Sequence, residues 1–254
     1  MPLSFFGSVY LATFLLSAWL TSALRLPLHQ WDALLAVIVA TRLSIRVSDD
    51  GRFRIGLAAP PALAARELLL GIGFAVVLIA LCDLLIISST ELRHIRGTGF
   101  PWRELLAVYA PAALHEELLF RGYPYQKVRT LSVAAAIAFT SIVFAALHGG
   151  NAGISPLAVV NLALTGVLLA LAYEVFRRLW FPIGIHIAWN LLSGPILGYN
   201  VSGYVSRWTV LETRGHGPEW LTGGHFGIEG SIWMVAVEVV GILVLMRMAR
   251  GREC

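Results

Sequence analysis

The chain has 254 residues, of which 57% are hydrophobic and only 13% are charged, and its mean hydropathy is +0.75. A soluble domain is typically about half apolar and one quarter charged, so this composition excludes a soluble globular protein and predicts a polytopic membrane protein. The net charge is +4, carried almost entirely by arginines that fall between apolar runs. Because the positive-inside rule places arginines there, we expect no nucleic-acid partner.

About eight apolar segments follow one another along the chain, most of them near the ~20 residues that a helix needs to cross a bilayer. The first lacks a basic N-terminal region and is followed by further segments, so we interpret it as a transmembrane helix and not as a cleaved signal. The second and seventh are short enough to tilt or to lie partly at the interface. The segments are 3–24, 31–45, 66–88, 102–123, 131–148, 155–176, 181–198 and 230–248.

With no internal repeat and no soluble segment, residues 1–254 are expected to form a single all-α integral membrane domain, a bundle of about eight spans. The loops richest in arginine alternate with loops of lower positive charge, which predicts a cell (inner) membrane protein with both termini in the cytoplasm. Segment 91–103 opposes this orientation because it carries three arginines. The basic loops are Arg42 to Arg54, Arg121 to Arg129, Arg177 with Arg178, and Arg247 to Arg252.

The longest polar stretch, residues 199–229, is rich in glycine and has no apolar period, so it is expected to be a structured or a mobile loop. Its length and glycines motivate the hypothesis that it gates access to a site. The two cysteines, Cys82 and Cys254, have neither a disulfide framework nor a metal-ligand spacing.

The stretch AALHEELLFRGYPYQ, residues 112–126, places charged side chains in an apolar segment. On a helix, Glu117 and Arg121 are one turn apart and can form an ion pair, whereas Glu116 points about 100° away. Either Glu116 is free for chemistry, or all three groups belong to one buried network that fixes the register of the bundle. HEELL is not the zinc motif H-E-x-x-H, because Leu119 stands at the last position. We therefore expect His115 to be a neighbour and not a ligand.

Two later segments contribute further polar groups. Phe144 and His148 are one turn apart at the end of an apolar run, and His186 and Asn190 are one turn apart in FPIGIHIAWNLL. Each pair alone is consistent with interfacial placement or with interhelical hydrogen bonds. A carboxylate, two imidazoles and a carboxamide are, taken together, the groups that hydrolysis needs. A carboxylate takes a proton from water, imidazoles share this role or bind a metal, and an amide N–H₂ stabilises an oxyanion.

These three patches, in this order, resemble the motifs E-E-x-x-x-R, F-x-x-x-H and H-x-x-x-N of the CAAX protease and bacteriocin-processing family of intramembrane endopeptidases. The match covers about residues 100–198, the expected catalytic core, and TGGHFGIEGS resembles a segment common in bacterial members. The resemblance implies that Glu116 activates water together with His148, and that His186 and Asn190 stabilise the oxyanion. The supporting residues are then Glu117, Arg121 and Phe144.

The implied activity is hydrolysis of a peptide bond in a membrane-associated protein or peptide, which in eukaryotic members is a prenylated CAAX protein. The substrate, the need for prenylation and the oligomeric state stay open. Glu116, His148 and His186 would suffice as ligands of a catalytic zinc, but a metal-free glutamate mechanism uses the same residues. Two other functions compete: a non-catalytic scaffold or immunity protein of the same fold, and a transporter or proton relay, against which the lack of a repeat argues.

A shared site for the two histidines imposes a geometric condition. Straight helices beginning at residues 131 and 181 would place His148 roughly 20 Å deeper than His186. One helix must therefore start at a different depth, break or tilt, and Pro182 and Gly184 favour an irregular start. Imidazoles more than about 10 Å apart would exclude the catalytic assignment, because proton transfer requires hydrogen-bond reach.

Overall fold

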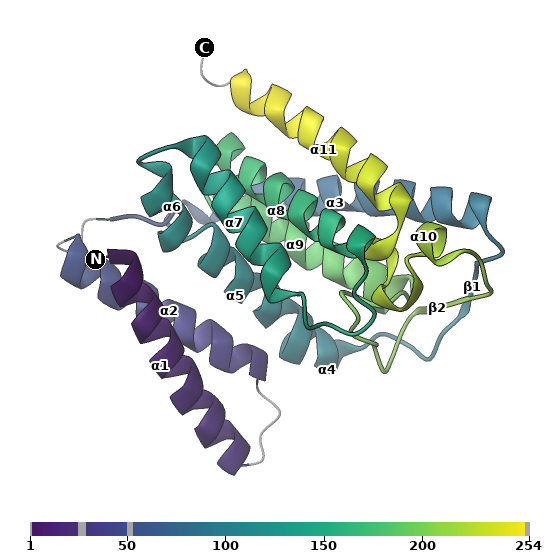
Figure 1. The fold of residues 1–254 in the computed structure, drawn as a ribbon, viewed down its shortest axis with the longest axis horizontal. Coiled ribbons are helices and arrows are strands. Elements are labelled where there is room, and N and C mark those ends of the chain that lie inside the picture. The colour runs from purple at the N-terminus through teal and green to yellow at the C-terminus, as the bar shows by residue number, and fades with distance from the viewer. Residues whose placement is uncertain (1, 25–28, 50–52, 252–254) are drawn as a thin grey trace.

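The structure, a computed structural model, describes residues 2–24, 29–49 and 53–251, and these form a helical bundle with one small sheet (Figure 1). Every apolar segment identified in the sequence is helical. The α-helices are α1 (Pro2–Ala23), α2 (His29–Ser48), α3 (Pro61–Ser89), α4 (Trp102–Glu104), α5 (Ala110–Phe120), α6 (Tyr123–Arg129), α7 (Val133–Leu147), α8 (Pro156–Phe176), α9 (Trp180–Leu191), α10 (Glu219–Thr222) and α11 (Ile232–Arg250).

The remaining elements are short. Two π-helical turns, η1 (Leu105–Tyr109) and η2 (Leu192–Ile196), precede α5 and follow α9, and two 3₁₀ turns, η3 (Gly224–Phe226) and η4 (Ile228–Gly230), precede α11. Strand β1 (Arg93–Arg96) pairs antiparallel with β2 (Leu211–Arg214), with His94 opposite Thr213. The helical class is therefore confirmed, and this two-stranded sheet is an addition that the sequence analysis missed.

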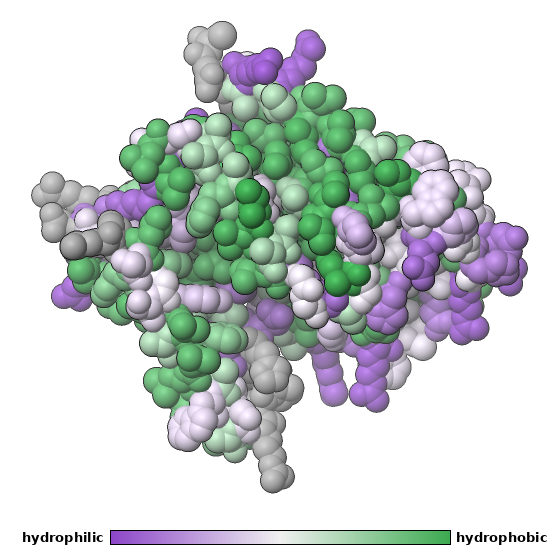
Figure 2. Space-filling view, in the orientation of Figure 1, coloured by the Kyte–Doolittle hydropathy of each residue, from purple (hydrophilic) through white to green (hydrophobic). Residues whose placement is uncertain are grey.

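Four helices of the described residues are long and apolar enough to cross a membrane, and they indicate an integral membrane protein. Figure 2 shows hydrophobic side chains over most of the bundle, with hydrophilic ones gathered around β1 and β2 and at the C-terminal end of α11. The other expected spans are helical but do not reach this length and apolarity, so a count of eight and the orientation stay predictions. The four are Leu3–Ala23, Pro61–Ser89, Pro156–Phe176 and Ile232–Arg250.

Some sequence predictions concern residues outside the described ranges. Residues 50–52 of the first basic loop lie there, as do Arg252 and Cys254 at the C-terminus. Cys82 is described, and it is a free, buried thiol in α3.

Helix α9 lies at the centre of the bundle and packs against α3, α5 and α8. Its first turn is already inside the protein, since Leu179 is 0% exposed and Phe181 is 2% exposed. The helix therefore begins in the interior of the bundle, and its depth relative to α7 stays a prediction. Helices α1 and α2 pack on each other and project from the bundle (Figure 1), and α2 also contacts α5.

A proline explains the irregular start of α5. Ala110 donates its backbone N–H to Leu105 five residues back, and the corresponding donor for Leu106 would be Pro111, which has no N–H. The indole Nε1 of Trp31 in α2 donates instead to the Leu106 carbonyl at 3.1 Å. Pro111 thus leaves a free carbonyl in the π-helical turn, and α2 contacts this turn through it.

Two glycines bring α3 and α9 into backbone contact. A Cβ atom at Gly71 would lie 2.2 Å from the carbonyl oxygen of Phe181, and one at Gly184 would lie 2.3 Å from that of Leu68. Because α9 carries His186 and Asn190, this contact sets their position.

We expect Gly71→Ala to lower the free energy of unfolding by about 1–3 kcal/mol, because the added methyl group forces the two helices apart. Gly73, half a turn along α3, provides the control, because a Cβ atom there would have no other atom within 4 Å. Gly73→Ala should leave stability unchanged or slightly raised. Thermal unfolding of both variants in detergent measures the difference, and equal melting temperatures would contradict the prediction.

Candidate active site

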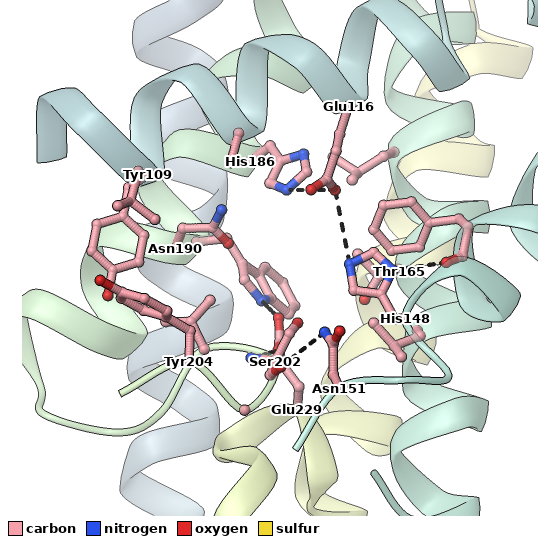
Figure 3. Close-up of a pocket in the computed structure, with 18 of the residues that line it drawn as sticks. Tyr109, Glu116, His148, Asn151, Thr165, His186, Asn190, Ser202, Tyr204 and Glu229 are labelled. Atoms are coloured by element: carbon pink, nitrogen blue, oxygen red, sulfur yellow. Dashed lines mark hydrogen bonds and ion pairs between the residues drawn. The ribbon is translucent and has the colours of Figure 1, made fainter. Parts of the chain in front are cut away.

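A cavity of about 350 Å³ lies between α5, the C-terminal end of α7, α8, α9 and the segment after η2 (Figure 3). The four predicted catalytic side chains, Glu116, His148, His186 and Asn190, all line it. They come from three different helices or their ends, as expected. The structure thus brings the three motifs together around one space.

Glu116 is the group on which both histidines converge. Its Oε2 atom lies 3.7 Å from Nε2 of His186 and 4.0 Å from Nε2 of His148. The same oxygen is buried and accepts no hydrogen bond from the described residues. The two imidazoles therefore share one centre, well inside the separation that would have excluded the assignment.

The other nitrogen of each imidazole has a partner that fixes its proton. Nδ1 of His186 lies 2.8 Å from Oε1 of Glu117, and Nδ1 of His148 lies 2.8 Å from the backbone carbonyl of Phe144. A carboxylate and a carbonyl can only accept, so Nδ1 is the donor in both rings. Each Nε2 is left facing Glu116 and the cavity. The spacing F-x-x-x-H is thereby explained, since the carbonyl one turn back orients His148.

Glu117 and Arg121 form the ion pair expected from their spacing. Arg121 donates from Nη1 to Oε1 of Glu117 at 3.0 Å and from Nη2 to the carbonyl of Gly166 at 3.0 Å, and both side chains are 0% exposed. The guanidinium also lies 5.3 Å from the ring centre of Phe144. Glu117 has a role that the sequence did not indicate, because the same Oε1 atom accepts from His186.

His115 lies outside the site. Its Nε2 atom is 2.9 Å from the hydroxyl of Tyr10 in α1, and its ring stacks on that of Tyr10. It does not line the cavity, in agreement with its expected role as a neighbour.

The residues named for zinc fit the metal chemically but not in their present spacing. Glu116 Oε2 and the two Nε2 atoms are suitable donors, and the hydrogen bonds on both Nδ1 atoms are typical of ligating histidines. Yet no group of three His, Cys, Asp or Glu side chains in the described ranges is arranged to hold a metal ion. Zinc binding by Glu116, His148 and His186 stays a prediction.

A second wall of the cavity comes from the segment after η2. Residues 199–229, which were expected to be either a structured or a mobile loop, are structured, since they contain β2, α10 and η3. Glu229 accepts hydrogen bonds from the N–H and the hydroxyl of Ser202, both at 2.7 Å, and from Nε1 of Trp189 at 3.0 Å. Asn151, three residues after His148, donates to the carbonyl of Ser202 at 2.9 Å. Sequence reasoning missed the polar lining residues Gln30, Tyr109, Asn151, Thr165, Ser202, Tyr204 and Glu229.

The sequence signals for this wall are weak. Glu229 lies in TGGHFGIEGS, a segment whose resemblance to bacterial members assigns no role to the carboxylate.

Burial, followed by the charge of Glu104, raises the pKa of Tyr204, so its hydroxyl stays protonated at neutral pH and is a donor beside the cavity. Residues 212–219 contain most of β2, away from this wall, and a gating role for the loop stays a prediction.

The fold and the site together define a helical membrane protein with a partly buried carboxylate between two imidazoles. Residues 98–192 match the family model described as type II CAAX prenyl endopeptidase Rce1-like, so this part of the chain is a domain of that family. The resemblance inferred from the motifs is confirmed, and the domain implies an intramembrane protease. Comparisons with curated proteins and with solved structures gave no match.

Proposed function

We propose that the protein is an intramembrane endopeptidase in which Glu116 activates the water that attacks a peptide bond. The observation that carries this proposal is the state of Glu116 Oε2, a buried carboxylate oxygen that has no hydrogen-bond partner among the described residues and faces Nε2 of His148 and of His186. Glu104, Glu117 and Glu238 also have a buried oxygen without a partner in the described part of the chain, but none of them lines the cavity. The position of Glu116 in the cavity wall between two imidazoles therefore favours chemistry over a scaffold, because an unpaired polar group there lowers stability.

The reaction follows from these positions. Glu116, assisted by His148, takes a proton from water, and the resulting hydroxide bonds to the carbonyl carbon while the C=O electron pair moves to oxygen. Protonated Nε2 of His186 and the amide N–H₂ of Asn190 donate to this oxyanion. Glu116 then returns the proton to the amide nitrogen, and the C–N bond breaks. The products are a new carboxyl group and a new amine.

Glu117 and Arg121 act through His186. Glu117 accepts from Nδ1 of His186, which holds the ring with Nε2 towards the cavity and stabilises the imidazolium form. Arg121 balances the charge of Glu117. We therefore assign both as positioning residues, with Phe144 orienting His148 through its carbonyl.

We propose a membrane-associated protein or peptide as the substrate, with a prenylated CAAX sequence as the first candidate from the family domain. If zinc takes part, Glu116, His148 and His186 would hold it, and it would supply Lewis-acid polarisation at the same centre. None of the steps assigned to these side chains depends on it.

The test is cleavage of a prenylated CAAX-type peptide, and of the same peptide without the prenyl group, by purified protein in detergent. Mass spectrometry should find one internal peptide bond hydrolysed by the wild type. His148→Ala should slow the reaction by about 10²–10⁴-fold, the usual contribution of a proton-transfer group. The same assay with a metal chelator tests whether cleavage depends on a metal ion. A folded wild type that cleaves neither these peptides nor membrane-associated proteins would overturn the proposal and favour the scaffold.

A further inference from the structure

We infer that the cavity wall opposite Glu116 is a subsite for a cationic side chain of the substrate, a lysine or an arginine, with Glu229 as the group that binds it. The inference rests on the proposed peptidase function and adds a substrate preference to it. Figure 3 shows Glu116 and Glu229 on opposite sides of the cavity, with Ser202 and Asn151 next to Glu229.

Both carboxylate oxygens of Glu229 accept hydrogen bonds. Its Oε1 atom accepts from Nε1 of Trp189, and its Oε2 atom accepts from the N–H and the hydroxyl of Ser202. An indole N–H and a backbone N–H can only donate. Each carboxylate oxygen therefore faces at least one obligatory donor.

This carboxylate has no cation beside it. Among the described residues no Lys, Arg or His nitrogen lies within 4.0 Å of it, whereas three other buried glutamates pair with arginine: Glu67 with Arg178, Glu117 with Arg121 and Glu174 with Arg129. Glu238 is buried without a cation as well, but unlike Glu229 it does not line the cavity. Nor is any Lys or Arg found among the described residues that line the cavity. A buried, unpaired charge is costly, and a ligand cation that pairs with it removes that cost.

The Glu229 side chain is held in place before any ligand arrives. Asn161 donates to its backbone carbonyl at 2.6 Å, and both carboxylate oxygens are hydrogen-bonded. Ser202 has a φ of 47°, a left-handed conformation that is uncommon for serine. Its carbonyl accepts from Asn151. Such a framework is typical of a binding group that must keep its direction.

The size of the cavity places the cation close to the reaction. A volume of about 350 Å³ is near the lower limit of roughly 300–1,000 Å³ for ligand pockets. A side chain that reaches Glu229 therefore belongs to a residue beside, or one removed from, the bond at Glu116. An acidic side chain at the same place would be repelled.

The test uses three peptides that differ only in a Lys, Gln or Glu beside the cleaved bond. In the wild type, kcat/KM should be highest for Lys and lowest for Glu. Glu229→Gln, which keeps the shape of the side chain but removes its charge, should reduce the Lys-to-Glu ratio by about tenfold or more, the usual effect of losing a hydrogen bond between charged groups.

Glu238→Gln is the matched control, because Glu238 is also 0% exposed, bonds to Thr165 and does not line the cavity. Its Lys-to-Glu ratio should equal that of the wild type. An unchanged ratio in Glu229→Gln would overturn the inference. If that variant does not fold, the wild type alone decides, since equal kcat/KM for the Lys and Glu peptides overturns it as well.

Binding of the same peptides, followed by fluorescence anisotropy, separates this inference from the peptidase proposal. Charge-selective binding that Glu229→Gln abolishes, without cleavage of any peptide, would support the subsite and reject the peptidase. Cleavage without charge preference would support the peptidase and reject the subsite.

Discussion

Replacing Glu116 by Gln is expected to lower the rate of peptide cleavage by about 10²–10⁴-fold, because an amide cannot accept the proton of the attacking water. The same change should lower the free energy of unfolding by at most about 1 kcal/mol, since Oε2 of Glu116 has no hydrogen bond to lose among the described residues and its ion pairs with His186 and His148 are long, 3.7 and 4.0 Å. Single-turnover rates and thermal unfolding of the purified protein measure the two effects separately.

The neighbouring residue provides a matched control. Glu117→Gln makes the same chemical change one position along α5, but it removes an ion pair with Arg121 and the charged acceptor of His186. It should therefore lower stability as well as rate. Wild-type cleavage by Glu116→Gln would show that Glu116 is not the proton acceptor. A greater loss of stability in Glu116→Gln than in Glu117→Gln would show that Glu116, and not Glu117, has the structural role.

Arg121→Met is expected to lower the free energy of unfolding by about 3–5 kcal/mol, the usual result of removing one partner of a buried ion pair. Methionine retains the apolar stem, but Glu117 is left charged and fully buried, and the carbonyl of Gly166 loses its donor. Chemical denaturation in a mild detergent measures the change. Activity should also fall, since Glu117 holds His186.

The control for this variant is Arg214→Met, which breaks an exposed pair with Glu212 in strand β2. Exposed pairs contribute at most about 1 kcal/mol, so stability should hardly change. Adding Glu117→Leu to Arg121→Met should recover part of the lost stability, because it removes a buried charge that has lost its arginine. Equal losses of stability in Arg121→Met and Arg214→Met would show that the buried Glu117–Arg121 pair contributes no more to stability than the exposed Glu212–Arg214 pair.

Local patterns in the sequence predicted a large part of this structure. Runs of apolar residues marked the helices, and the one-turn spacing of Glu117 and Arg121 predicted their ion pair, because both features depend on residues close in sequence. The three motifs identified Glu116, His148, His186 and Asn190, which share one cavity. Their roles stay predictions.

Contacts between residues distant in sequence could not be predicted from local patterns. Glu117 and His186 are 69 positions apart and meet only because α5 and α9 pack together. Ser202 and Glu229 lie in a segment without hydrophobic period, and their bond depends on a left-handed serine that no pattern announces. The start of α9 is buried because the helix packs against α3, a long-range contact that local patterns do not predict.

Most of the cavity lining lies in the family domain, but Gln30 precedes that domain and the wall opposite Glu116 follows it. Residues 98–192 contain every side chain that we assign to bond cleavage, whereas Ser202, Tyr204 and Glu229 follow the domain. A fragment ending at residue 192 would keep the reactive groups and lose the opposite wall. Bond cleavage and charge selectivity, as we propose them, therefore belong to separate stretches of the chain, and substitutions in the later stretch can alter the proposed selectivity while the proposed reactive groups stay in place.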